Sequence, residues 1–116
     1  MSISWSSGEQ RGVAVMRVAG FLGSSAVERF SEGFGWVAAR STGAVVLDLT
    51  ELLGWSTEGE AAVLQAAAML RKSERSLVLC GLDRIEATQS RVIHHDSMTV
   101  YPDLDTALGA QAPPSG

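Results

Sequence analysis

Residues 45–59 read VVLDLTELLGWSTEG, and the architecture of the chain can be built outward from them. With Ala44 in front, they begin with a short, nearly continuous apolar run that ends at Leu49. Such a run is typical of a β-strand that is covered on both faces. An alanine-rich helix is predicted at residues 58–72, and its basic last turn suits the negative end of the helix dipole.

A second strand of the same type follows this helix, at residues 76–82. Strand, helix and strand succeed one another within about 40 residues, which indicates a right-handed crossover between parallel strands. We therefore expect residues 44–49 and 76–82 to lie side by side and to run in the same direction.

A hairpin is predicted before this unit. We expect residues 3–5 to form a short edge strand and residues 13–19 a longer strand that is closed by Gly20. The turn that joins the two strands is expected at residues 8–12, between two glycines.

The helix after the hairpin is indicated by apolar residues whose spacing forms one face: Val27, Phe30, Phe34 and Val37. Ser24 and Ser25 precede it with hydroxyls suited to the N-cap. Glu28 lies three residues after Ser25, as in a capping box. We therefore expect side-chain capping at the start of this helix.

Three weaker elements complete the chain. We expect a helix at residues 83–93, a strand at 98–101, a helix at 103–110 and a disordered tail at 111–116. The order is then β, β, α, β, α, β, α, β, α, without an internal repeat or a linker. It predicts the α/β fold class, with a mixed, mostly parallel β-sheet and α-helices packed against it.

Composition and charge argue against several classes of function. The net charge is −4 without a basic cluster, so binding to nucleic acid is not expected. The longest apolar run, residues 61–70, is too short for a bilayer, and the first residues lack the pattern of a signal peptide. We therefore expect a cytoplasmic protein without membrane insertion. Cys80, the one cysteine, lies in an apolar run and is expected to be a buried, inert thiol.

The order of these segments resembles the STAS family, the domain of anti-sigma factor antagonists and of sulphate-transporter tails. Residues 45–59 are similar to the family's apolar strand, its Asp-Leu step, an apolar turn and an Asp-Ser-Ser-Gly or Asp-Ser-Thr-Gly motif before an alanine- and leucine-rich helix. Residues 18–22 resemble a strand that ends in Gly-x-Leu, 77–82 the next core strand, and 101–108 the C-terminal strand and helix. None of these motifs is very specific by itself, but the order of all of them over residues 13–110 is specific.

The resemblance implies a single domain over residues 1–110 that regulates bacterial transcription by binding a protein. In the family, the loop before the alanine-rich helix is the regulatory site, where a serine kinase, often the anti-sigma factor itself, phosphorylates the serine after the aspartate. The unphosphorylated form binds the anti-sigma factor and frees the sigma factor. The implied partner is therefore an anti-sigma factor/serine protein kinase, and no cofactor is expected.

The site loop departs from the family pattern. An ungapped alignment puts Ser56 at the aspartate, Thr57 at the phosphorylated serine, Glu58 at the next Ser or Thr, and Gly59 at the glycine. Thr57 and Ser56 are the candidate phosphorylation sites. Gly23 stands where the family often has another aspartate, and Glu60 replaces a usually apolar residue. The implied partner-binding residues are Gly23, Ser24, Trp55, Ser56, Thr57, Glu58, Gly59 and Glu60.

Three interpretations of this loop are open. In the first, Thr57 is the N-cap of a capping box, and Glu60 reaches back to its amide. In the second, Thr57 or Ser56 accepts a phosphate at the positive end of the helix dipole, where Glu58 and Glu60 would repel it. In the third, Glu58 makes the loop permanently acidic and partly imitates the phosphorylated state. The first two are compatible, because a capping hydroxyl can also be modified.

Other polar and aromatic residues have structural as well as functional interpretations. Trp55 either fills the core under the loop or anchors a partner. Asp48 ends a core strand, where a carboxylate can accept hydrogen bonds from loop amides. The neighbours His94, His95 and Asp96 have diverging side chains, so a metal site there is not expected. The sequence lacks catalytic and nucleotide-binding motifs, so we do not expect an enzyme.

Alternative functions fit the same fold. The chain could be a non-phosphorylated structural STAS subunit of a transporter complex or a signalling scaffold. It could also hold a small ligand between helix and sheet, although no residue favours a particular ligand. A homodimer is left open.

Overall fold

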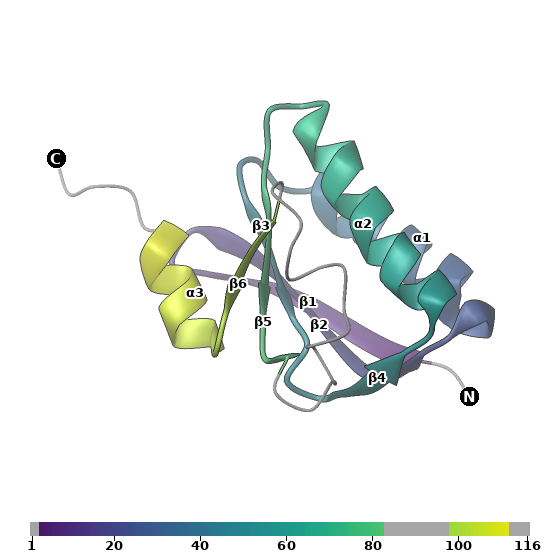
Figure 1. The fold of residues 1–116 in the computed structure, drawn as a ribbon. Coiled ribbons are helices and arrows are strands. Elements are labelled where there is room, and N and C mark those ends of the chain that lie inside the picture. The colour runs from purple at the N-terminus through teal and green to yellow at the C-terminus, as the bar shows by residue number, and fades with distance from the viewer. Residues whose placement is uncertain (1–2, 83–97, 112–116) are drawn as a thin grey trace, which may run out of the picture.

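A computed structural model describes residues 3–82 and 98–111 of the chain. They form one β-sheet with helices packed against it (Figure 1). The strands are β1 (Ile3–Gln10), β2 (Val13–Leu22), β3 (Val45–Asp48), β4 (Leu52–Trp55), β5 (Leu77–Cys80) and β6 (Met98–Tyr101). The helices are α1 (Val27–Ala39), α2 (Thr57–Arg71) and α3 (Leu104–Gln111), and a short 3-10 turn, η1 (Ser24–Ala26), precedes α1.

The sheet is mixed and mostly parallel, as the order of segments predicts. β1 and β2 are antiparallel, whereas β2 with β3, β3 with β5 and β5 with β6 are parallel. The strand order is β1-β2-β3-β5-β6, and β4 pairs in parallel with the end of β2. Val45 lies opposite Leu77 and Leu47 opposite Leu79, which confirms that the two apolar strands run side by side in one direction.

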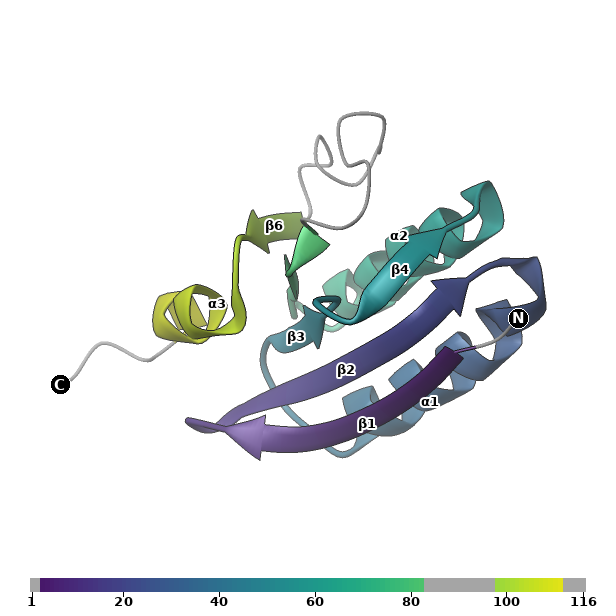
Figure 2. The ribbon, with the colours of Figure 1, turned by 90° about the horizontal axis from the view of Figure 1, so that it is seen from below.

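Helices cover the two faces of the sheet unequally. α1 and α2 lie together on one face, and α3 lies on the other face at the far end of the molecule (Figures 1 and 2). In β3, Leu47 belongs to the core under α1 and α2, while Val46 belongs to the cluster under α3, and both side chains are fully buried. This burial on both faces explains why β3 is apolar at almost every position.

The hairpin of β1 and β2 closes with a two-residue turn. Arg11 and Gly12 both have positive φ, 54° and 79°, which is the combination that a type I′ turn requires. β1 therefore continues to Gln10, and the prediction of a three-residue strand with Gly8 in the turn was wrong. The serines of β1 concealed its length, because exposed polar residues at an edge give little strand signal.

The start of α1 differs from the predicted capping box. The helix begins at Val27 after the η1 turn, without a side-chain cap hydrogen bond. The Ala26 amide donates instead to the Gly23 carbonyl (2.9 Å). Because Ser25 is inside the 3-10 turn, it does not occupy the position that a capping box with Glu28 needs.

The loop after β3 contains a strand that the sequence does not predict. β4 lies beside the end of β2, where the register shifts between Gly20 and Phe21. Gly20 adopts a φ of 100°, and β2 passes through this irregularity to Leu22 instead of ending at Gly20. Four residues are too few for a period to be recognised, so the sequence pattern predicts a turn where β4 lies.

The C-terminal elements confirm the predicted strand at 98–101 and the predicted helix, which extends to Gln111. The predicted helix at residues 83–93 lies outside the described residues, as do residues 112–116 of the predicted tail. Within the described ranges, no helix has the length and apolar character needed to cross a bilayer.

Candidate functional site

Ser56 fixes the loop between β4 and α2 against the end of β2. Its amide donates to the Leu22 carbonyl (3.0 Å). Its hydroxyl accepts a hydrogen bond from the Gly59 amide (3.1 Å), which makes Ser56 the N-cap of α2. Its carbonyl accepts from the Glu60 amide (2.9 Å). Ser56 therefore sets both the first turn of the helix and its distance from the sheet.

Thr57 is not the N-cap, so the predicted capping box of Thr57 and Glu60 was wrong by one position. Gly59 stands three residues after the true cap, Ser56, and has no side chain that could reach back. Thr57 is instead the first helical residue, with an exposed side chain. Its hydroxyl makes no hydrogen bond to any part of the chain that the structure covers.

Gly59 is required by the close contact between α2 and β2. A Cβ atom at this position would lie only 1.9 Å from the carbonyl oxygen of Leu22, far inside contact distance. Glycine is therefore the residue that lets the first turn of the helix pack on the strand. A glycine at position 59 thus has a steric reason in this chain.

The two glutamates of the first helical turn have different surroundings. Glu58 is exposed, whereas Glu60 is only 7% exposed. Both lie near the positive end of the helix dipole, which favours a carboxylate. Of these two glutamates, only Glu58 presents an accessible carboxylate beside Thr57. The sequence suggests two exposed carboxylates at this surface, but the structure has one of them exposed.

The second loop of the predicted site lies beside the first. Gly23 follows Leu22 directly, so the hydrogen bond from Ser56 to Leu22 holds the two loops together. Gly23 is buried, and the exposed Ser24 is the residue of this pair that presents a side chain. Trp55 is half-buried and packs against the core, as its interpretation as a core residue predicts.

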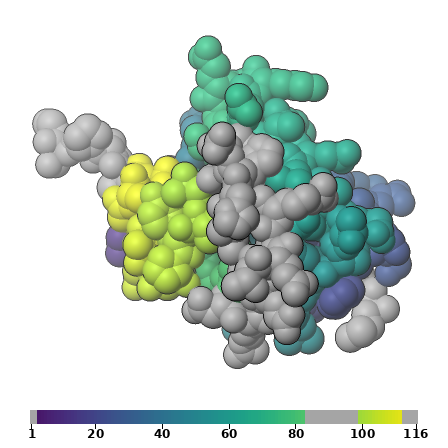
Figure 3. Space-filling model, in the orientation of Figure 1, coloured from purple at the N-terminus to yellow at the C-terminus, as the bar shows by residue number. Residues whose placement is uncertain are grey.

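The start of α2 lies at the surface of the molecule. It follows the end of β4 at the lower right of Figure 1, and the teal atoms of this segment are visible in the space-filling view (Figure 3). Leu53 of β4 is 58% exposed and adds an apolar side chain two residues before Trp55. Sequence reasoning missed Leu53, because a leucine in an apolar stretch is usually a core residue.

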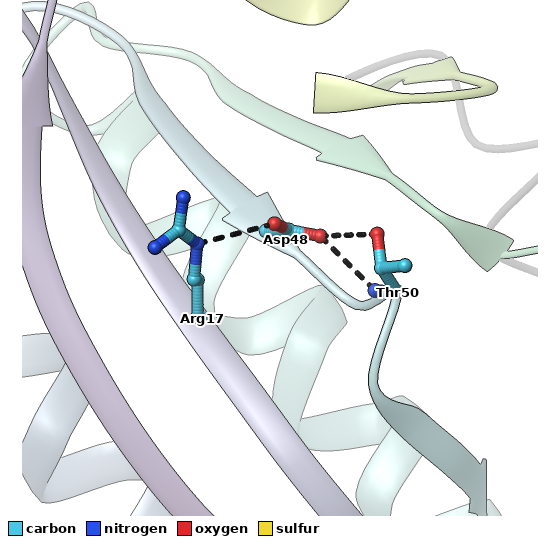
Figure 4. Close-up of polar contacts among 3 residues, drawn as sticks. All are labelled: Arg17, Asp48 and Thr50. Atoms are coloured by element: carbon cyan, nitrogen blue, oxygen red, sulfur yellow. Dashed lines mark hydrogen bonds and ion pairs between the residues drawn. The ribbon is translucent and has the colours of Figure 1, made fainter. Parts of the chain in front are cut away.

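Asp48 organises the turn between β3 and β4 (Figure 4). One carboxylate oxygen accepts hydrogen bonds from the Thr50 amide (3.0 Å) and the Thr50 hydroxyl (2.6 Å). The other lies 3.4 Å from Nε of Arg17, which stands opposite Asp48 in the β2–β3 register. This confirms that Asp48 accepts a loop amide, and its role is structural. No pattern in the sequence points to Arg17, because its pairing with Asp48 depends on the strand register.

Cys80 is fully buried, as predicted. Burial, together with the nearby Asp48 carboxylate, raises the pKa of its thiol to about 12. The thiol is therefore neutral and unreactive at ordinary pH. Residues 94–96, weighed as metal ligands, lie outside the described residues, and the part that is described gathers no group of three or more metal-ligating side chains.

Comparison with solved structures finds the same fold in several proteins. An anti-sigma factor antagonist from Mycobacterium paratuberculosis is 24% identical, with a TM-score of 0.76 over 93% of this chain and 92% of the other. The anti-sigma factor antagonist SpoIIAA in its unphosphorylated form is 14% identical, with a TM-score of 0.69 over 93% of this chain and 96% of the other. The murine anion transporter Slc26a9 is 18% identical, with a TM-score of 0.70 over 91% of this chain but only 19% of the transporter.

At these identities the likeness to solved structures is one of fold alone. No curated protein matches the sequence of the chain. The family model of the STAS domain, however, matches residues 4–107, a range that begins in β1 and ends in α3. The chain therefore belongs to the STAS domain family.

Proposed function

We propose that this chain is a cytoplasmic regulator of the anti-sigma factor antagonist type, which acts by binding an anti-sigma factor/serine protein kinase and not by catalysis. The proposed binding surface consists of the two adjoining loops, with Ser24, Trp55, Thr57 and Glu58 as its accessible residues and Leu53 beside them. The observation that carries the proposal is the exposed Thr57 hydroxyl, at the start of a helix that Ser56 and Gly59 hold rigidly against the sheet.

Phosphorylation of Thr57 is the proposed control of binding. Ser56 is the less suitable acceptor, because its hydroxyl already accepts the Gly59 amide and its side chain is only partly exposed. A phosphate on Thr57 would add nearly two negative charges to a surface that carries one accessible carboxylate, Glu58. The added charge and bulk would repel a partner that fits the neutral hydroxyl.

The helix dipole and Glu58 act on such a phosphate in opposite directions. Free amides of the first helical turn favour an anion, whereas the adjacent carboxylate disfavours it. Glu60 is only 7% exposed and already takes part in an interaction of its own, so the accessible carboxylate beside Thr57 is that of Glu58. Thr57 is therefore compatible with phosphorylation despite the two glutamates of the loop.

The test is phosphorylation of the purified chain by its cognate anti-sigma factor kinase, followed by mass spectrometry. We expect a gain of one phosphate that Thr57→Ala abolishes. Ser56→Ala is the matched control and should still accept phosphate. If Ser56→Ala abolishes the gain and Thr57→Ala does not, the acceptor is assigned wrongly. If neither hydroxyl accepts phosphate, the switch is refuted.

A second function is favoured by the residues that replace the family motif. Ser56 stands in place of the acidic residue, and Glu58 gives the loop a permanent negative charge. A non-phosphorylated STAS subunit of a transporter complex or signalling scaffold would have no need of the switch, and Slc26a9 is a transporter with a domain of this fold. A pull-down from the source cell separates the two functions, since a histidine-kinase-like ATPase supports the first and a transporter ATPase the second.

A further inference from the structure

β1 is an open edge of the sheet among the described residues. It pairs with β2 along its whole length, and β2 is its one neighbour in the strand order. Gln10 and Val13 flank the two-residue turn as a hydrogen-bonded pair, so the amides and carbonyls of the odd-numbered residues of β1 point away from β2. This outward row can accept another antiparallel strand.

β1 also lacks the features that usually protect an edge. Proline, lysine and β-bulges prevent edge strands from pairing with other chains. Ile3–Gln10 contains no proline and no basic residue, and its register with β2 is continuous. The single charge on the strand is Glu9, close to its end.

An aromatic cluster on α1 continues this edge. Trp36 is 48% exposed, and its ring centre lies 6.0 Å from that of Trp5 in β1. The Arg40 guanidinium lies over the Trp36 ring at 4.2 Å. The Trp5 ring also packs directly over Gly33 of α1. Tryptophan and arginine side chains of this kind are enriched at protein interfaces.

Trp36 is flanked by one acidic and one basic residue, Glu32 and Arg40. A two-fold rotation would bring the acidic residue of one chain opposite the basic residue of the other. Glu32, Trp36 and Arg40 are spaced four residues apart, so they lie along one side of α1, and both charged side chains are exposed. α1 runs in the same direction as β1 (Figure 2). One axis near Ser7 and Trp36 would therefore relate both elements to their copies and would place each Glu32 opposite the Arg40 of the other chain.

We propose that β1 and the Glu32–Trp36–Arg40 side of α1 form a homodimer interface, in which the two β1 strands pair antiparallel across a two-fold axis. We expect the binding partner to be a second copy of this chain. An interface between identical surfaces must be complementary to itself, and this surface carries both the acidic Glu32 and the basic Arg40. The surface does not include residues 55–60, so the dimer and partner binding can be tested separately.

Sedimentation velocity of the full chain at about 1–100 μM tests the proposal. We expect a dimer whose fraction rises with concentration. Glu32→Arg and Arg40→Glu should each weaken it roughly tenfold or more, because each creates two contacts between like charges. The double variant E32R/R40E should restore the dimer, because the swapped charges are again complementary. Arg71→Glu on α2 changes the net charge by the same amount and sign as Arg40→Glu and is the control that should leave the dimer intact.

Ser7→Pro tests the strand pairing itself. The Ser7 amide points away from β2, so proline removes a donor from the proposed interface without breaking the hairpin. Loss of the dimer with an unchanged circular dichroism spectrum supports the proposal. A chain that stays monomeric throughout, or a dimer that the two charge reversals leave unchanged, overturns it. A double variant as weak as the single ones overturns the antiparallel arrangement of α1.

Discussion

Replacing Gly59 by alanine puts a methyl group where α2 and β2 leave no room for one. The new Cβ would lie 1.9 Å from the Leu22 oxygen, so the first turn of α2 must move by about 1 Å. Overpacking of this kind costs about 1–3 kcal/mol. The movement also disturbs the hydrogen bond from Ser56 to Leu22, which is worth about 1 kcal/mol. Alanine has a higher helix propensity than glycine, which offsets about 1 kcal/mol of this loss in stability. We therefore expect the free energy of unfolding to fall by about 2 kcal/mol and Tm by about 10 °C.

Gly35→Ala is the matched control for this experiment. Gly35 also lies inside a helix, but nothing stands within 4 Å of the position its Cβ would take. The same substitution should therefore stabilise the chain there, by about 0.5–1 kcal/mol. Urea unfolding followed by circular dichroism measures both variants. If Gly59→Ala were as stable as the wild type, or stabilised like Gly35→Ala, the close packing of α2 on β2 would be refuted.

Three further predictions concern the cap, the turn and the buried thiol. Ser56→Ala should lower the free energy of unfolding by about 1 kcal/mol through loss of the N-cap, whereas Thr57→Ala should change it by less than about 0.5 kcal/mol; thermal unfolding distinguishes them. Asp48→Ala should cost about 1–3 kcal/mol in urea unfolding, and Asp48→Asn less, because asparagine keeps an acceptor for the Thr50 amide. Burial raises the folded pKa of Cys80 from 9.0 to about 12. As pH rises, the thiol ionises in the unfolded chain before it ionises in the folded chain. The free energy of unfolding, relative to that of Cys80→Ala, should therefore fall as pH rises from 9.0 to about 12. The same dependence of unfolding free energy on pH in both proteins would contradict this.

The central strands and the main helix were predictable because burial imposes a pattern on them. β3 and β5 are covered on both faces, so nearly every residue is apolar, and α2 is rich in alanine with a basic end. β4 and most of β1 were not predictable for the opposite reason. β4 has four residues, and β1 is an edge strand whose exposed serines give no alternation of apolar and polar residues.

The resemblance is the reason for placing the candidate site at this loop, but it did not predict the local geometry of the loop. Ser56 and Thr57 are both good N-cap residues, so residue type alone cannot decide between them. The decision comes from contacts with a distant strand, since the Ser56 amide is bound to Leu22 and Gly59 must pack there. The burial of Glu60 depends in the same way on tertiary packing, although its neighbour Glu58 is exposed.

Amide chemical shifts of the isotope-labelled chain, recorded by NMR while the unlabelled anti-sigma factor kinase is added, address the role of the α2 loop most directly. The account predicts that the largest changes cluster at Ser24, Leu53 and residues 55–58, and that they vanish when Thr57 carries a phosphate. Changes confined to β1, α1 or α3, with the amides of residues 55–58 unmoved at saturation, would contradict it.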